Sequence, residues 1–127
     1  MFVNVGSRPS AQAFIVSLLS ANLHVPVSTK IPDDRPEKFV TVQRIGGGMQ
    51  NPVTDRVQVA IQAWDGSEVD AERLCLDCEA VLAAYVCTPF HGVMIRHFRE
   101  VTAPLNFPDE SGQPRYQALV EFDLIVH

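Results

Sequence analysis

The sequence is short of the residues that several large functional classes require. Aromatic residues make up only 8% of its 127 residues, and ten Lys and Arg are outnumbered by fifteen Asp and Glu, for a formal net charge of −5. Such a chain lacks the basic surface of a nucleic-acid-binding domain. No apolar run approaches the ~20 residues of a membrane-spanning helix. Residues 1–20 lack the basic start and long apolar core typical of a signal peptide, so we expect neither a membrane protein nor a secretory leader.

Cysteine is also scarce. The three cysteines are an odd number, which argues against a disulfide framework and for a reducing compartment. With His91 they spell C-x2-C-x8-C-x3-H, a spacing that superficially resembles a zinc site. Cys75 and Cys78, however, fall on the apolar stripe of a predicted helix, where free cysteines act as small hydrophobic side chains. We therefore expect no metal, no redox pair and no other cofactor.

The motifs of common enzyme classes are missing as well. The run Gly46–Gly48 is followed by a predicted strand and not by Lys-Ser/Thr at a helix start, so it does not form a phosphate-binding loop. No nucleophile motif accompanies the four histidines. The carboxylate pairs Asp33-Asp34 and Asp109-Glu110 fall in expected exposed loops, away from the desolvated setting that acid–base catalysis requires. The sequence therefore predicts no enzyme.

Hydrophobic spacing predicts two helices. The first lies near residues 9–21, with Pro9 in its first turn and Asn22 as a left-handed stop. The second follows Ser67, which forms a capping-box-like start with Asp70. It carries the strongest periodic pattern of the chain, namely Ala71, Leu74, Cys75, Cys78, Val81, Leu82 and Tyr85.

The second predicted helix has two further surfaces. Opposite its core stripe, where a solvated face would carry charge, lie three apolar residues: Leu76, Ala80 and Ala83. We interpret them as a packing surface against a neighbouring subunit, or alternatively against another element of the fold. Along one shoulder of the stripe lie three acidic residues: Glu68, Glu72 and Glu79. That shoulder is either simply solvated or faces DNA without binding it, because like charge opposes close contact.

Four segments have the two-residue period of strands with one buried face: 38–45, 55–64, 93–101 and 115–126. Proline-rich loops are expected at 25–37 and 103–114, and a long, flexible, glycine-rich hairpin tip at 46–52. The order α-β-β-α-β-β predicts one α+β domain over residues 1–127, with a four-stranded, mostly antiparallel sheet and two helices packed on one face.

Several stretches of this layout are similar to the tail terminator, or tail-completion, proteins of long-tailed bacteriophages. They are Phe39–Gly47, Asp55–Trp64 with Ala71–Leu74, and the proline-rich Pro108–Tyr116. The resemblance covers nearly the whole chain through short motifs. It implies an α+β structural protein of the virion, located at the neck after assembly in the host cytoplasm. Six copies would form a ring that caps the tail tube, ends its polymerisation and offers a docking face to the head connector.

The resemblance also implies partners for this chain, with DNA passing through the ring without specific binding. Copies would meet through Leu76, Ala80 and Ala83. The tail tube protein and the connector, or stopper, protein would contact Gly46, Gly47, Gly48, Met49, Gln50, Asn51 and Arg115. Arg115 is equally suited to an internal pair with Asp109. Two alternative functions remain open: another neck or head–tail joining protein of the same particle, and a small cellular ligand-binding or enzymatic domain.

Overall fold

Serine side chains start the helices of the computed structural model, which describes residues 8–126. In α1 (Ala11–Leu23), the Ser10 hydroxyl accepts a hydrogen bond from the Ala13 amide at 3.1 Å. The helix ends at His24, whose φ of 56° is left-handed. The predicted stop at Asn22 is therefore wrong by two residues, because Asn22 stays helical and donates its side-chain amide to the Leu18 carbonyl.

The start of α2 (Glu68–Ala84) confirms the predicted cap: the Ser67 hydroxyl accepts the Asp70 amide at 3.1 Å. Glu68 and Asp70 in the first turn suit the positive end of the helix dipole. The predicted core stripe is buried at Ala71, Leu74, Cys75, Cys78 and Leu82.

The sheet has five strands in the order β1-β2-β3-β5-β4. They are β1 (Val27–Ser28), β2 (Phe39–Asn51), β3 (Thr54–Trp64), β4 (Met94–Asn106) and β5 (Arg115–Ile125). β1 pairs in parallel with β2, and the remaining pairs are antiparallel. The α+β class is confirmed, but the expected four strands are five: the two-residue β1 lies in the segment predicted to be a loop.

The hairpin between β2 and β3 also differs from the expected one. Residues 46–51 are not a flexible tip but the outer half of β2, paired with β3 as far as Asn51 and Thr54. Only Pro52 and Val53 connect the two strands. The Asn51 side chain accepts the Val53 amide at 3.0 Å and stabilises this turn.

The edge strand β4 is longer and less regular than expected. It continues to Asn106, through residues predicted to be loop, and its register with β5 shifts three times. Pro104 is tolerated there because one side of an edge strand needs no ladder partner. Both the bulges and the proline distort the outer edge of this strand.

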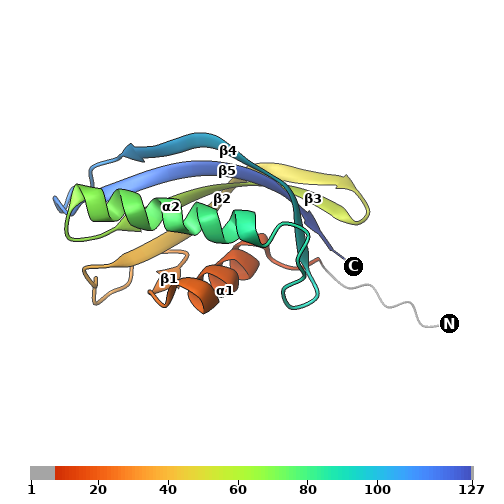
Figure 1. Cartoon of the computed structure of the whole chain (residues 1–127), viewed down its shortest axis with the longest axis horizontal. Coiled ribbons are helices and arrows are strands. Elements are labelled where there is room, and N and C mark those ends of the chain that lie inside the picture. The colour runs from red at the N-terminus through yellow and green to blue at the C-terminus, as the bar shows by residue number, and fades with distance from the viewer. Residues whose placement is uncertain (1–7, 127) are drawn as a thin grey trace.

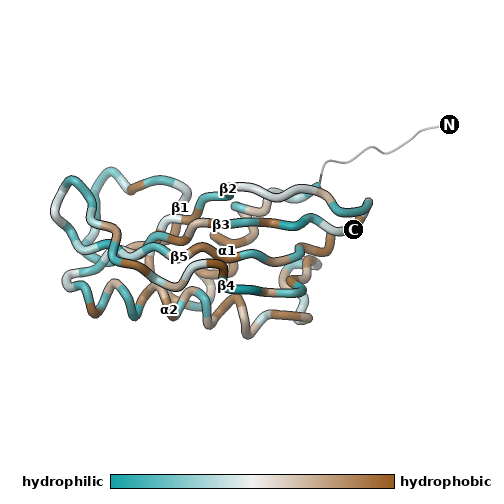
Figure 2. The backbone as a smooth tube through the Cα atoms, turned by 90° about the horizontal axis from the view of Figure 1, so that it is seen from above, coloured by the Kyte–Doolittle hydropathy of each residue, from teal (hydrophilic) through white to brown (hydrophobic). Residues whose placement is uncertain are grey.

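The core lies between one face of the sheet and the two helices (Figure 1). Its largest fully buried aliphatic residues include Ile15, Leu18, Leu19, Val40, Val42, Ile61, Leu82, Ile95 and Leu124. The predicted inward face of β5 is confirmed by Ala118, Val120, Phe122 and Leu124. Figure 2 shows that α2 runs along the β4 edge of the sheet. Within residues 8–126, neither helix has the length and apolar character needed to cross a bilayer.

Candidate assembly surfaces

The sheet face that points away from the helices is covered by paired polar side chains. Thr41 donates its hydroxyl to Gln62 at 3.3 Å, and Gln62 donates its amide to Gln117 at 2.7 Å. Further along the strands, Gln58 donates to Glu121 at 2.8 Å and Arg56 donates to Asp123 at 3.0 Å. These cross-strand pairs stabilise the strand register, and in them the polar side chains of this face form hydrogen bonds with one another.

Arg115 lies in an aromatic cluster at the start of β5. Phe39 and Trp64 stack with centroids 4.5 Å apart, and the Arg115 guanidinium lies 5.4 Å from the Trp64 ring and 4.3 Å from the Phe107 ring. Its Nε donates to the Phe107 carbonyl at 2.7 Å. Its Nη1 is also 3.9 Å from Asp109, the internal pair that the sequence left open. With a side chain only 14% exposed, Arg115 is engaged within the chain.

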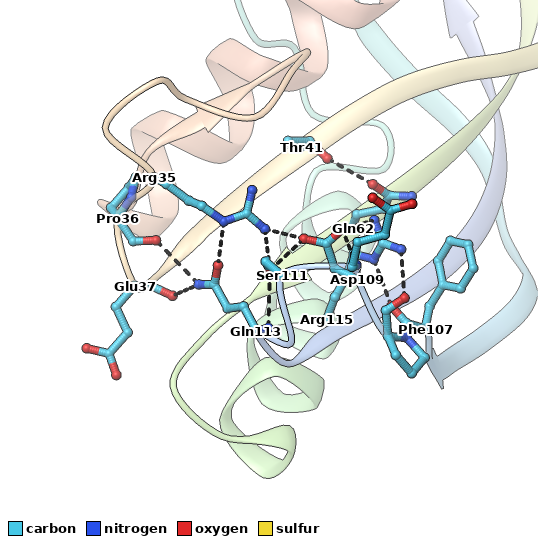
Figure 3. A network of polar contacts seen from close by, with 12 residues as sticks. Arg35, Pro36, Glu37, Thr41, Gln62, Phe107, Asp109, Ser111, Gln113 and Arg115 are labelled. Carbon is cyan, nitrogen blue, oxygen red and sulfur yellow. Dashed lines mark hydrogen bonds and ion pairs between the residues drawn. The ribbon is translucent and has the colours of Figure 1, made fainter.

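The two proline-rich loops are joined by a polar network at the same end of the sheet (Figure 3). Arg35 donates to the Asp109 carboxylate, to Ser111 at 2.7 Å and to Gln113 at 3.2 Å. Gln113 in turn donates to the Glu37 carbonyl at 2.8 Å. The hydrogen bond from Ser111, followed by that from Arg35, holds the pKa of Asp109 below its usual value. This network joins segments more than seventy residues apart, so periodicity gives no signal for it.

The outer half of the β2–β3 hairpin carries the predicted docking residues. Its base is fixed by a buried ion pair, in which Arg44 donates to both carboxylate oxygens of Asp55 at 2.8 and 2.7 Å. Beyond this pair, the large apolar side chains Ile45, Met49 and Val53 are exposed. The hairpin is thus a firmly anchored arm with an apolar surface near its end.

On α2, the predicted contact residues Ala80 and Ala83 are exposed and Leu76 is half-buried. Glu68 and Glu72 are also exposed, as expected.

Glu79 differs from the other two acidic residues, because its side chain is not on the exposed shoulder. It is 7% exposed, packs against β4 beside Glu100, and its Oε1 has no hydrogen-bond partner. Burial, and secondarily the neighbouring Glu100, raises the pKa of Glu79 to about 8. Helical spacing predicted that Glu79 lies beside the core stripe, on the solvent side. Spacing within α2 carries no information about β4, which covers this residue in the structure.

Over residues 7–115 the chain matches a protein family described as phage tail termination protein. The chain belongs to this family. The match confirms the resemblance seen in the sequence, and it ends where β5 begins. The family is one of structural, non-enzymatic components of the phage tail. Among curated proteins, none matches the chain.

Two of the three cysteines of this tail termination family member are small core residues. Cys75 and Cys78 are buried, and Cys87 is exposed. Burial raises the pKa of Cys75 to about 12 and that of Cys78 well above its usual value, so neither is a reactive thiolate. Within residues 8–126, His, Cys, Asp and Glu form no group of three or more arranged to hold a metal ion.

We predict that Cys75→Ser and Cys78→Ser each lower the free energy of unfolding by roughly 1–3 kcal/mol, because each buries a hydroxyl in apolar surroundings. Cys87→Ser, at the exposed position, is the matched control and should leave stability unchanged. Urea denaturation of the three variants measures the difference. Zinc at one equivalent in the purified protein, lost on changing Cys87, would overturn this interpretation of the cysteines.

A groove of ≈ 290 Å³ lies between the start of α1 and the segment before β4. Its lining includes Pro9, Phe14, Phe90 and Val93, with Ser10, Ser17 and His91 as the polar residues. Among residues 8–126, no carboxylate lines this groove, and its described lining is mainly apolar.

Proposed function

We propose that six copies of this chain form a ring on the end of the phage tail tube, stop tube polymerisation and present a docking face to the head connector. The proposal starts from the membership of the chain in the tail termination family and adds the assembly through which it would act. The observation that carries it is the outer face of α2, where Ala80 and Ala83 are exposed and Leu76 is half-buried. Small apolar side chains on the exposed face of the C-terminal half of α2 suit close packing against a second subunit.

The two ends of the sheet support separate contacts at the two faces of such a ring. β3 pairs with β5 from Thr54 and Ile125 at one end to Trp64 and Arg115 at the other. The hairpin turn therefore lies at one end of the molecule and the loop at 107–114 at the opposite end (Figure 1). A ring between tube and connector requires two such opposed docking elements. We assign the hairpin and this loop to them, with Met49 as an apolar anchor of the hairpin.

The exposed acidic residues of α2 support passage of DNA through the ring without binding. Glu68 and Glu72 are solvent-exposed. If this shoulder faces the ring channel, its negative charge opposes close contact with the phosphate backbone.

The variant Ala80→Arg tests the subunit contact. A long charged side chain on the packing face should block ring formation and leave the subunit folded, because Ala80 is exposed in the single chain. We expect a monomer by sedimentation, an unchanged circular dichroism spectrum, and overlong tails in phage that depend on the variant. Ala21→Arg, on the exposed face of α1, is the matched control and should assemble normally.

Two results would contradict the proposal. Rings of Ala80→Arg together with tails of normal length would remove α2 from the subunit interface. Tails of normal length in phage lacking the chain altogether would assign it instead to another neck or head–tail joining role.

A further inference from the structure

A buried carboxyl group whose hydrogen-bonding neighbour is a second carboxyl group lies where α2 meets the edge strand β4. The Glu79 side chain is 7% exposed, and its Oε1 receives no hydrogen bond. Its carboxyl neighbour is Glu100, an exposed residue of β4. A buried polar group that lacks a partner is costly, and such groups in native structures call for an explanation.

Among residues 8–126, the charged groups that act on the pKa values of Glu79 and of the neighbouring thiols are all acidic. On α2 itself the nearby ionisable groups are Glu72, Asp77 and the thiols of Cys75 and Cys78, and on β4 the group is Glu100. β5 contributes the Tyr116 hydroxyl, next to Glu68 and Glu72. α1 has no ionisable side chain, and β3 contributes only Asp55 and Arg56, which pair with Arg44 and Asp123. No ion pair of residues 8–126 includes Glu79 or Glu100.

The carboxyl pair borders the face already assigned to the subunit contact. Glu79 directly precedes Ala80 on α2, and Glu100 precedes the exposed Val101 on β4. α2 and the β4 edge lie side by side along the flank of the molecule (Figure 2). A second subunit that covers Ala80 therefore also reaches the exposed carboxyl group of Glu100, which contacts that of Glu79.

Complementary charge lies on the other side of the same edge strand. Arg96 and Arg99 are exposed on β4; Arg99 pairs with Glu121 at 3.3 Å, whereas Arg96 forms no ion pair within residues 8–126. Their register partners Asp123 and Glu121 lie on the sheet face away from the helices, whereas Glu100 is opposite the buried Val120 on the helix side. The acidic and basic groups thus lie on opposite sides of one strand. A contact between them is head-to-tail and can close into a ring.

We propose that the Glu79–Glu100 carboxyl pair receives an arginine side chain of a second copy of this chain, supplied by the Arg96–Arg99 segment of its β4. This inference rests on the proposed ring and names the polar contact within it. A guanidinium offers the planar donors that match carboxylate oxygens, so an arginine on the exposed Glu100 carboxylate takes the place of the proton that Glu79 and Glu100 share.

The contact makes ring formation dependent on pH. In the free subunit the carboxyl pair retains a proton, because the pKa of Glu79 is raised to about 8. The docked arginine stabilises the ionised form, so the proton is released on association. Release of one proton strengthens association by up to about tenfold per pH unit as the pH rises from 6 towards 8. Glu79→Gln cannot release this proton and should abolish that dependence.

Charge exchange tests the contact directly by sedimentation of the purified chain. We expect Glu100→Arg alone and Arg96→Glu alone each to weaken self-association by at least about tenfold. An equimolar mixture of the two variants should restore assembly in alternating order, because every interface then joins opposite charges. Glu110→Arg, an equal change of charge in the exposed loop, is the matched control and should associate as the unchanged chain does.

The outcomes separate this contact from the ring itself. Rings of the unchanged chain whose stability is independent of pH between 6 and 8, or rings formed equally well by Glu100→Arg, would overturn the carboxyl–arginine contact and leave the ring proposal intact. An unchanged chain that stays monomeric at all concentrations and pH values would overturn both.

Discussion

Replacement of Asp55 by alanine should lower the free energy of unfolding by about 3–5 kcal/mol, the cost expected for breaking a buried ion pair. Asp55 is fully buried and accepts two hydrogen bonds from the Arg44 guanidinium. Arg44 also donates to the carbonyls of Gly46 and Arg56, so it cannot easily turn out to solvent. The variant would leave a partly buried cation without its anion at the base of the hairpin.

The same pair predicts a loss of stability in acid. The hydrogen bonds from Arg44 hold the pKa of Asp55 below its usual value of 3.8. An acid with a lowered pKa stabilises the fold above its unfolded pKa, and the contribution disappears as the pH falls through the folded pKa. The free energies of unfolding of Asp55→Ala and of the unchanged chain should therefore differ at pH 7 and converge as the pH falls. Urea denaturation at a series of pH values measures both.

Two comparisons make this prediction sharp. Asp34→Ala, in an exposed loop, should cost less than about 0.5 kcal/mol. Arg44→Met combined with Asp55→Leu replaces the pair by apolar side chains and should recover much of the loss, because no charge is left buried. Equal stability of Asp55→Ala and Asp34→Ala would show that the pair contributes nothing.

Gly47→Ala should lower the free energy of unfolding by about 1–3 kcal/mol and distort the outer half of the β2–β3 hairpin. Gly47 has a φ of +91°, and a Cβ atom there would lie 1.9 Å from the Arg56 carbonyl oxygen. The backbone must therefore move. Under the proposed function, phage carrying Gly47→Ala should also produce tails of abnormal length, because the displaced hairpin no longer presents Met49 to its partner.

Gly48→Ala is the matched control for this effect. The two glycines are adjacent, yet a Cβ atom at Gly48 meets nothing within 4 Å. Denaturation and hydrogen exchange of the hairpin amides should distinguish the two variants clearly. Equal stability and equal tail lengths would show that the hairpin tolerates the clash or has no part in docking.

The sequence predicted those elements whose signals are local and periodic. The Ser67 cap, the stripe of α2 and the inward face of β5 depend on spacing within one segment, and the structure confirms them. The prediction of a flexible tip at Gly46–Gly48 is wrong because glycine is typical of two different structures. It favours flexible loops, but it also allows the positive φ and the close approach to the next strand that Gly47 shows here.

The sequence could not predict features that depend on distant segments. β1 is only two residues long and exists because β2 lies beside it. The network of Arg35 with Asp109 and the burial of Glu79 depend on how separate elements pack, and no spacing within either segment records that packing.

The irregular edge of β4 bears on how copies of the chain behave when they accumulate. A long, flat strand edge is a template for fibrils, because its free amide and carbonyl groups pair with any extended chain. The three register shifts and Pro104 deny β4 such regular pairing. Contacts at this flank must therefore be made by side chains. Such contacts require one partner geometry, and they are complete once a single partner has bound. The irregular outer strand thus protects this flank of the molecule from open-ended aggregation.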